Sequence, residues 1–400
     1  MAAPLEGIRV LDLSRVLAGP LASQILADLG ADVIKVERPG SGDETRTYPP
    51  FSACDDSRPT YSSYFASVNR GKRSVTIDFA KPEGQELVRE LVDKSDVLVE
   101  NYKVGSLLKL GLGYADLASR NPRLIYCSIT GFGQTGPYRH KAGYDLVIQG
   151  MGGLMSITGE GNGQPMKAGV AIADTSTGLY AAIAILAALY DRNQSNCGQH
   201  IDLALFDVQV AGLLNHASSY LMTNEVPKRH GNAHMSVVPY QVFPTSSGAI
   251  ILAVANDSLF RKLAKVLGMP HLASDPRYRT NADRVRNREE LIPLIEKRLA
   301  EATTREWLEK LDVAQIPAGP INSVDEVFAD PQIVERNMLA EVPSTNGKIR
   351  VAGSPLNFSR STLSTSVPPP LLGADTVDVI SNYLGKSSTE IEELCKKGII

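Results

Sequence analysis

The sequence has 400 residues, of which 43% are hydrophobic, and its formal net charge is −3. This length predicts two or three domains with enough apolar material for packed cores. Charges of both signs are spread along the chain, so we expect no nucleic-acid partner and no basic surface that binds a membrane.

The cysteines and histidines do not indicate a metal site. The cysteines, which form no CxxC pair, are Cys54, Cys127, Cys197 and Cys395. Such wide spacing favours free thiols in a reducing compartment, with Cys127 in the core. The six histidines show no HExxH or other ligand spacing, so we predict no metal.

The apolar runs are short, and the longest, around residues 181–190, does not reach the length of a bilayer. A strand is predicted from Ile8 onward, which leaves no room for a signal or transit peptide before it. We therefore expect a cytoplasmic protein, or a mitochondrial matrix protein whose presequence has been removed.

The first predicted elements form a βαβ unit: a strand over 8–13, a helix over 21–29 and a strand over 33–36. The turn between the first strand and the helix carries Ser14, Arg15, Ala18, Gly19 and Pro20, and it lacks the glycine fingerprint of a dinucleotide site. After the second strand, Arg38 precedes a glycine-rich loop, where a phosphate contact is an alternative to a solvated charge.

The same pattern continues with strands predicted over 75–77, 96–99 and 123–129, and with a helix that opens at Pro82. Alternating strands and helices predict a parallel sheet with both faces covered, whose ligands lie beyond the carboxyl ends of the strands. Side chains near such ends or turns are Arg38, Lys72, Arg73, Asn101 and Lys103. The gathering of cations predicts a ligand with several phosphates.

Residues 131–136 match the pattern GxGxxG directly after a strand. A dinucleotide motif must run straight into a helix, whereas residues 137–141 are typical of a loop. We predict instead a glycine-rich loop whose backbone N–H groups approach a substrate. Tyr144 and Asp145 follow this loop.

The segment around Asp174 combines a carboxylate with a long apolar helix. We predict a short strand over 170–173, then Asp174, then small polar residues, and a helix from Leu179. This helix is apolar on nearly every side and is expected to be buried. Asp174 could simply cap the helix by accepting a backbone N–H, or it could be a desolvated nucleophile or base.

Composition changes over 224–232, which is polar and is predicted to be a linker. A smaller unit is expected after it, with strands over 240–243 and 250–254, a helix over 258–267, and a further helix that contains Trp307. No internal repeats or low-complexity tracts are present.

The motifs together resemble those of a known family. They are LDLSRVLAGP, GADVIKVERPGSGDETR, NRGKRSVTIDF, SDVLVENY, GLGY, SITGFGQTGPYRHKAGYD, GQHIDLALFD, GNAHMSVVPYQVF, IPAGPIN and PPPLLGADT, in this order. From Pro4 to Ile400 the sequence resembles the class III (CaiB/BaiF-type) CoA-transferases, most of all those that use succinyl-CoA and a dicarboxylate of the hydroxymethylglutarate or glutarate type.

This resemblance implies an α/β subunit with a Rossmann-like large domain, a smaller α+β domain, and two subunits interlocked as a homodimer. Residues 1–224 would form the N-terminal part of the large domain, residues 225–325 the small domain, and residues 326–400 a segment that returns to the large domain.

The resemblance also implies roles for single residues. Asp174 matches the catalytic aspartate, and Tyr144 and Asp145 match the pair beside the thioester. Further CoA contacts are implied for Leu17, Ala18, Arg38, Asn69, Lys72, Asn101, Tyr102, Lys103 and Lys109. Lys109 stands where the family often has arginine.

Two departures from the formyl-CoA transferase branch disfavour oxalate as the acceptor acid. That branch has histidine and glutamine where this chain has Arg15 and Leu17, and it has a mobile tetraglycine loop near the place of residues 255–257. Arg15 is a candidate for holding the second carboxylate of a dicarboxylic acid.

The reaction implied by the resemblance is the transfer of CoA from an acyl-CoA, with succinyl-CoA as the expected donor, to a carboxylic acid, expected to be a dicarboxylate, through an aspartyl anhydride and an aspartyl–CoA thioester. It needs no cofactor beyond CoA as substrate, and neither a metal nor NAD. Acceptors implied by the resemblance are glutarate, hydroxymethylglutarate, itaconate and citramalate.

Three alternatives remain at this point. An α-methylacyl-CoA racemase needs two acid/base groups, and Tyr144 stands where such racemases have histidine, although the pKa of tyrosine suits this task poorly. A non-catalytic CoA-binding protein would have no need of Asp174. A dehydrogenase is disfavoured by the missing fingerprint in the first turn.

Overall fold

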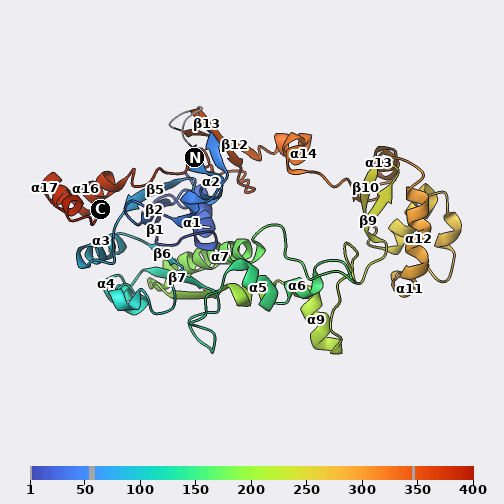
Figure 1. Cartoon of the computed structure of the whole chain (residues 1–400), viewed down its shortest axis with the longest axis horizontal. Helices are drawn as coiled ribbons and strands as arrows, with labels where there is room; N and C mark the ends of the chain where they lie inside the picture. Colours follow the sequence, from blue (N-terminus) through green and yellow to red (C-terminus); the bar gives the residue numbers. More distant parts are fainter. Residues whose placement is uncertain (1, 54–58, 345–346) are drawn as a thin grey trace. The chain divides into compact units, whose positions relative to one another are not determined.

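The computed structural model describes residues 2–53, 59–344 and 347–400. Its large unit is built on a six-stranded sheet in the order β5-β2-β1-β6-β7-β8, and every neighbouring pair is parallel (Figure 1). In this order the strands are Lys72–Thr76, Asp32–Glu37, Arg9–Asp12, Val97–Glu100, Ile125–Thr130 and His200–Ala204. This is the strand order of Rossmann-type sheets, so the predicted α/β class is confirmed.

Both faces of the sheet are covered because successive strand residues point to opposite sides. Val10 belongs to the core with α1 and α7, whereas Leu11 belongs to the core with α3 and α16. The helices of the first face are α1 (Ala18–Asp28), α5 (Asp145–Met151), α7 (Ile172–Ser195) and α8 (Leu205–Ala211). Those of the second face are α3 (Pro82–Val92), α4 (Tyr114–Arg120), α16 (Thr376–Leu384) and α17 (Ser388–Lys396).

The edge strand β5 is completed by the C-terminal segment. The Ser74 N–H donates to the Asp375 carboxylate (2.8 Å), and the Thr76 N–H donates to the Thr376 hydroxyl (3.0 Å). Backbone groups that would otherwise be an open sheet edge are therefore paired.

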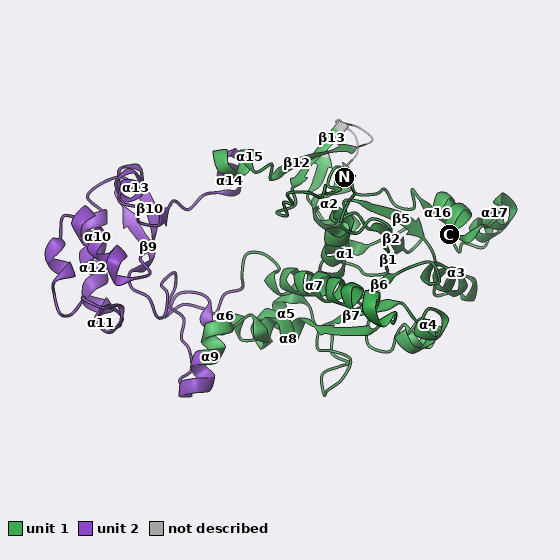
Figure 2. Cartoon of the chain, turned by 180° about the vertical axis from the view of Figure 1, so that it is seen from behind, with its two compact units in different colours: residues 1–154, 168–218, 331–400 green, residues 155–167, 219–330 purple. Residues whose placement is uncertain are grey.

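The chain divides into two compact units, coloured in Figure 2. Residues 1–154, 168–218 and 331–400 form the large unit, and residues 155–167 and 219–330 form the small one. The predicted domain limits of 224 and 325 stay a prediction.

The small unit has its own core. Strands β9 (Tyr240–Thr245), β10 (Gly248–Ala253) and β11 (Ala318–Gly319) form an antiparallel sheet. Four helices pack on it: α10 (Asp257–Val266), α11 (Asn281–Arg286), α12 (Arg288–Leu299) and α13 (Thr304–Val313). The buried Trp307 indole donates to the Leu299 carbonyl (2.8 Å), which ties α13 to α12.

Shorter elements complete the fold. They are η1 (Glu44–Thr47), β3 (Phe51–Ala53), β4 (Pro59–Ser62), α2 (Ser63–Val68), η2 (Leu108–Leu110), α6 (Leu154–Ile157), α9 (Leu214–Thr223), η3 (Pro270–Ala273), α14 (Val324–Ala329), α15 (Pro331–Glu335), β12 (Leu339–Ser344) and β13 (Gly347–Ala352). The hairpin β12–β13 packs on β4 and α2 through Val342, Ile349, Tyr61 and Ala66.

Helix α7 differs from the prediction because it begins at Ile172, so the strand expected over 170–173 is wrong. By length and composition it is the only helix in the described part of the chain that could cross a membrane. Its inner face nevertheless lies in the core of the large unit, with Ala181 and Ile185 fully buried. Cys127 is buried in the same core, Cys197 and Cys395 are exposed, and Cys54 lies outside the described residues.

Candidate active site

A cleft opens where the strand order reverses, between the carboxyl ends of β1 and β6. It has a volume of about 180 Å³ and is lined by the turn after β1, the loop after β6, the end of β7 and residues 139–144. Open parallel sheets bind ligands at such switch points. The predicted site residues that line this cleft are Arg15, Leu17, Ala18, Asn101, Tyr102, Lys103, Tyr144 and Asp174.

Asp174 lies in the first turn of α7 and is half-buried. Its carboxylate accepts no hydrogen bond from any residue that the structure describes, and the helix has Ala171, not Asp174, as its N-cap. The simple capping role is therefore excluded. Burial, and next to it the charge of Asp145, raises the pKa of Asp174 to about 7.

The capping role belongs to Asp145, at the start of α5. Its Oδ1 accepts the backbone N–H groups of Ala173 (2.9 Å) and Asp174 (3.3 Å). Its Oδ2 accepts from the Gln149 amide (2.7 Å). A carboxylate at a helix N-terminus is favourable, and here it also points the start of α7 into the cleft.

The segment between Gly131 and Tyr144 is a loop, as predicted, because α5 begins only at Asp145. Gly131 and Gly143 touch at its base: a Cβ on Gly131 would lie 2.6 Å from the Cα of Gly143. Any other residue at these positions would separate the two ends of the loop. The glycines therefore set the width of the cleft beside the 71% exposed Tyr144.

Arg15 lines the cleft but already has an anionic partner. Its guanidinium contacts the Glu44 carboxylate (2.6 Å) and lies over the Tyr102 ring, 5.0 Å from its centroid. Both partners of the ion pair are more than 40% exposed, so an incoming carboxylate can compete with Glu44 for Arg15.

A second cleft of about 670 Å³ adjoins the first, and Arg15, Glu44 and Tyr102 line both. Arg38 lies in this second cleft, exposed, with no ion-pair partner among the described residues. Arg38 in the larger cleft and Asp174 in the smaller one therefore lie along adjoining clefts.

Four predicted contacts do not line either cleft: Asp145, which caps α7 as described above, and Lys72, Asn69 and Lys109. Lys72 is buried, and its ammonium donates to Asp12 (3.0 Å), the Pro20 carbonyl (2.9 Å) and Asn69 (2.8 Å). Because these bonds use all three of its donors, Lys72 cannot bind a phosphate. Asn69 is equally buried, and Lys109 is exposed on η2 away from both clefts.

Glu44 and Tyr64 lie at or near the site, although no sequence pattern points to them. Glu44 is one of several acidic residues in a loop and has no distinguishing neighbour in the sequence. The Tyr64 ring, at the start of α2, lies near the reacting region: burial, then the charge of Asp174, raises the pKa of its hydroxyl. The run Tyr61, Tyr64, Phe65 predicts no more than a core helix.

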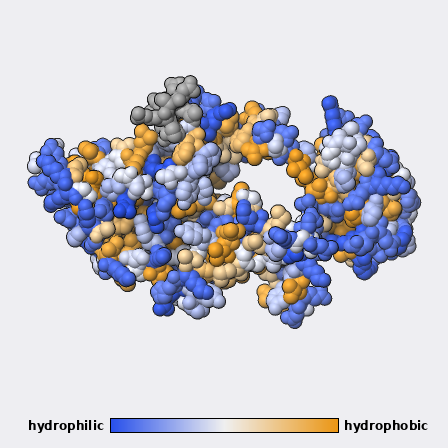
Figure 3. All heavy atoms as spheres, in the orientation of Figure 1, coloured by the Kyte–Doolittle hydropathy of each residue, from blue (hydrophilic) through white to orange (hydrophobic). Residues whose placement is uncertain are grey.

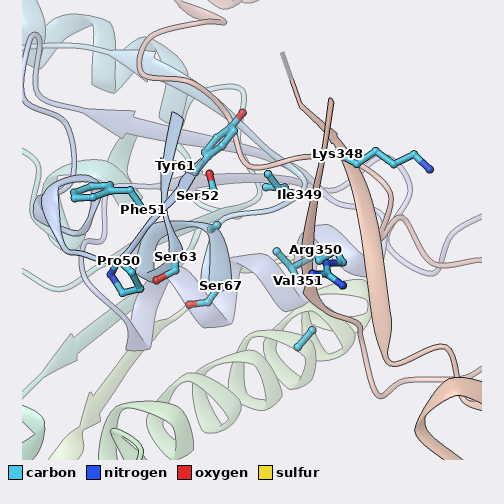
Figure 4. Close-up of a pocket in the computed structure, with 12 residues that line it drawn as sticks. Pro50, Phe51, Ser52, Tyr61, Ser63, Ser67, Lys348, Ile349, Arg350 and Val351 are labelled. Carbon is cyan, nitrogen blue, oxygen red and sulfur yellow. The ribbon is translucent and has the colours of Figure 1, made fainter. Parts of the chain in front are cut away.

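A further pocket, shown in Figure 4, lies between β3–β4, α2 and the hairpin β12–β13. It measures about 590 Å³ and contains none of the predicted site residues. Volume alone therefore does not identify the active site; the desolvated carboxylate does. In the described residues, no group of three or more His, Cys, Asp or Glu side chains could hold a metal ion.

Comparison with known proteins agrees with this geometry. The model of the family described as CoA-transferase family III matches residues 5–376. Succinate–glutarate CoA-transferase of Agrobacterium fabrum is 49% identical, over 94% of this chain and 95% of its own. Human succinyl-CoA:glutarate CoA-transferase is 45% identical, over 99% and 90%. The crystal structure of a CAIB/BAIF family protein from Brucella suis superposes with a TM-score of 0.85 at 47% identity, over 96% and 100%.

Proposed function

Because the chain belongs to CoA-transferase family III, we propose that it moves CoA from succinyl-CoA to a dicarboxylic acid, with Asp174 as the covalent nucleophile. The observation that carries the proposal is the Asp174 carboxylate. It stands at the switch-point cleft without a hydrogen-bond donor from the described residues, and its pKa is raised to about 7.

The substrates follow from the relatives and from the charges of the site. The two relatives above are named for succinyl-CoA or succinate and for glutarate, both four- or five-carbon dicarboxylates. Arg15 would bind the distal carboxylate by exchanging its contact with Glu44. Glutarate, hydroxymethylglutarate, itaconate and citramalate are the acceptors to test.

In the first half-reaction, a carboxylate oxygen of Asp174 attacks the thioester carbonyl. The C–S bond breaks, and CoA thiolate leaves with the electron pair, which yields a mixed aspartyl anhydride. The thiolate then attacks the Asp174 carbonyl and releases succinate, so that CoA is held as an aspartyl thioester. The acceptor carboxylate attacks the carbonyl of this thioester and displaces CoA thiolate, which gives a second mixed anhydride. The thiolate then attacks the acyl carbonyl of the acceptor in this anhydride, so that the new acyl-CoA forms and the Asp174 carboxylate is released.

The negative charge that develops on the carbonyl oxygen needs donors close to Asp174. Leu17 and Ala18, at the start of α1, line the same cleft, and we propose their N–H groups as these donors. Neither has an acceptor among the described residues. Such donors, fixed before the reaction, stabilise an oxyanion without reorganisation.

The remaining contacts describe the path of CoA. Arg38 would bind a phosphate in the larger cleft, while Tyr102 and Lys103 would lie along the chain that leads to Asp174. Tyr144 would cover the thioester from the loop before α5. The N–H groups of the loop 131–143 offer further contacts.

The test is intact mass spectrometry of the protein mixed with succinyl-CoA. We expect a CoA-sized adduct that hydroxylamine removes, because hydroxylamine cleaves thioesters, and that Asp174→Ala lacks. Asp174→Asn is the matched control, since it keeps the shape of the side chain but not the nucleophile. Acceptor acids added to the adduct should release it at rates that identify the substrate.

Two outcomes would overturn the proposal. An adduct that survives in Asp174→Ala would place the nucleophile elsewhere. Tight CoA binding with no adduct under any acyl donor would favour a binding protein, whereas deuterium uptake at the α-carbon of a branched acyl-CoA would favour a racemase.

We also propose a homodimer, supported by the outer face of α7. Its exposed apolar residues are Leu179, Tyr180, Ile183 and Tyr190. In Figure 3 apolar atoms gather over the stretch where Figure 1 draws α7. A contiguous exposed apolar face of this kind marks an interaction surface. The compartment, cytoplasm or mitochondrial matrix, stays a prediction.

A further inference from the structure

The turn after β1 is held by side chains from three other segments. Lys35 donates its ammonium to the Ser14 carbonyl (2.7 Å). The Asn101 amide both accepts from the Arg15 N–H (2.9 Å) and donates to the Arg15 carbonyl (2.7 Å). The Asp43 carboxylate accepts from the Val16 N–H (3.3 Å). Four successive backbone groups are thus paired with side chains, where a turn would ordinarily pair with backbone or water.

The conformation that these contacts hold is strained. Val16 has φ +70°, in the left-handed region, which is rare for a β-branched residue. Glycine or asparagine would occupy this region at little cost. Such strain persists only where the surroundings hold it, and it concentrates at functional sites.

Two of the side chains that hold the turn, Lys35 and Asp43, are buried charges, and burying a charge costs desolvation free energy. Lys35 and Asp43 form an ion pair (3.0 Å) with side chains no more than 1% exposed. Further hydrogen bonds fix Asp43, from the Thr45 N–H (3.0 Å) and from the Thr45 hydroxyl (2.8 Å). Replacing a buried ion pair by hydrophobic residues is often neutral or stabilising, so we infer that this pair is kept for the position that it imposes on the turn.

The two residues after the turn, Leu17 and Ala18, line the cleft. Leu17 and Ala18 follow Val16 directly, and their N–H groups have no acceptor in the described part of the chain. If the turn relaxed to an ordinary conformation, both N–H groups would change direction relative to Asp174.

We propose that Lys35, Asp43 and Asn101 are positioning residues, which hold the strained turn at Val16 so that the N–H groups of Leu17 and Ala18 face the reacting carbonyl. This inference rests on the proposed function and adds to it. It also changes the role of Asn101, since both ends of its amide are engaged by Arg15 and a direct contact with CoA is not needed.

The test compares Val16→Gly and Asn101→Ala with the wild-type protein, in steady-state kinetics and in urea unfolding. Glycine relieves the strain but loosens the turn, so Val16→Gly should keep or raise the unfolding midpoint while kcat falls about 10- to 100-fold. Asn101→Ala should lower kcat in the same range and leave KM for the acyl-CoA within about threefold. Asn101→Asp, which can accept from Arg15 but cannot donate to its carbonyl, should lie between.

Val226→Gly is the matched control, because it places the same change in an exposed loop outside the left-handed region. It should leave kcat unchanged. The positioning role is overturned if Val16→Gly retains full kcat, or if Asn101→Ala raises KM alone, as a CoA contact would. Asp43→Asn adds a direct probe of the ion pair, and the first two variants carry the test should it fail to fold.

Failure here is separable from failure of the proposed function. If the wild-type protein forms the hydroxylamine-sensitive adduct while Val16→Gly and Asn101→Ala form it at the wild-type rate, only the positioning role is lost. If the wild-type protein forms no adduct, the nucleophile itself is wrong.

Discussion

At the scale of the residue, the site depends on a carboxylate that is kept from water. Asp174 has the raised pKa of a buried acid with an anionic neighbour, Asp145. The free enzyme therefore holds a proton on its nucleophile through much of the mildly acidic range. Only the anion can attack a thioester, so its pKa links activity to pH.

We expect kcat/KM for the acyl-CoA to fall about tenfold per pH unit below a midpoint near 7, because the pKa of Asp174 is raised to about 7. Stability changes in the opposite sense. Between about pH 4 and pH 7 the folded protein binds a proton that the unfolded chain has released, so the free energy of unfolding falls as pH rises through this window.

Asp174→Asn removes that dependence. At pH 8 it should be more stable than the wild-type protein by on the order of 2 kcal/mol, and below about pH 4 the two should be equal. Urea unfolding at both pH values measures the difference. A kinetic midpoint near 4, together with equal stability at pH 8, would show that Asp174 is solvated like an ordinary aspartate.

A residue of the candidate site could be predicted from the sequence where the residues next to it in the chain form a recognisable pattern. Asp174 was singled out as a lone carboxylate between a short apolar run and a long apolar helix, whereas Arg15 and the polar run at 101–103 were singled out because they follow predicted strands. The buried position of Lys72 was not predicted, because a lysine after a turn is usually solvated and its partner Asp12 is 60 positions away. The ion pair between Arg15 and Glu44 could not be predicted either, because the two residues are 29 positions apart and no local sequence pattern links them.

At the scale of the element, α1 and α7 approach unusually closely one turn after Asp174. Gly178 makes this possible: a Cβ there would lie 2.8 Å from the Ala18 carbonyl oxygen and 3.1 Å from the Leu21 side chain. The glycine thus brings the start of α1, with its donors, close to the nucleophile on α7.

Gly178→Ala separates two opposing effects. Alanine improves helix propensity by about 1 kcal/mol, whereas overpacking costs about 1–3 kcal/mol. The clash is with backbone, which cannot rotate away, so we expect net destabilisation of about 1 kcal/mol and a fall in kcat. Asn193→Ala, on the exposed side of the same helix, should be neutral or slightly stabilising. Urea unfolding of both variants decides; a stabilised, fully active Gly178→Ala would contradict the close approach.

The start of α7 shows what local reasoning misses. The small polar residues after Asp174 predicted that the helix begins later, with Asp174 before it. The helix begins at Ile172 because Asp145, from another element, accepts the N–H groups of Ala173 and Asp174 in its first turn. A cap supplied by a residue far away in the chain cannot be recognised from the sequence that flanks the helix.

At the scale of the whole molecule, the alternation of strands and helices predicted the parallel sheet, and the family motifs predicted its large and small parts. The alternation alone does not show that the strand order reverses between β1 and β6, the reversal that places the cleft; only the Rossmann-like resemblance implied it. Strand order depends on long-range pairing, which composition and periodicity do not report.

The assembly can be tested through α7. Ile183 is 61% exposed at the middle of the outer apolar face. We expect the wild-type protein to be a dimer by light scattering at micromolar concentration, and Ile183→Glu to be monomeric or aggregated, because a charge would be buried without a partner. Gln194→Glu, an exposed position of the same helix, should stay dimeric. A monomeric wild-type protein would contradict the proposed interface.

The bond between Ser74 and Asp375 also has a consequence for synthesis. The two residues are 301 positions apart, so β5 leaves the ribosome long before the segment that closes its edge. At 5–20 residues per second, the delay is about 15–60 s. During that time the nascent sheet presents an unpaired strand to any other chain nearby, which is the kind of surface that chaperones bind. We therefore expect the speed of translation between the codons of these two residues, about three quarters of the message, to affect the yield of this enzyme.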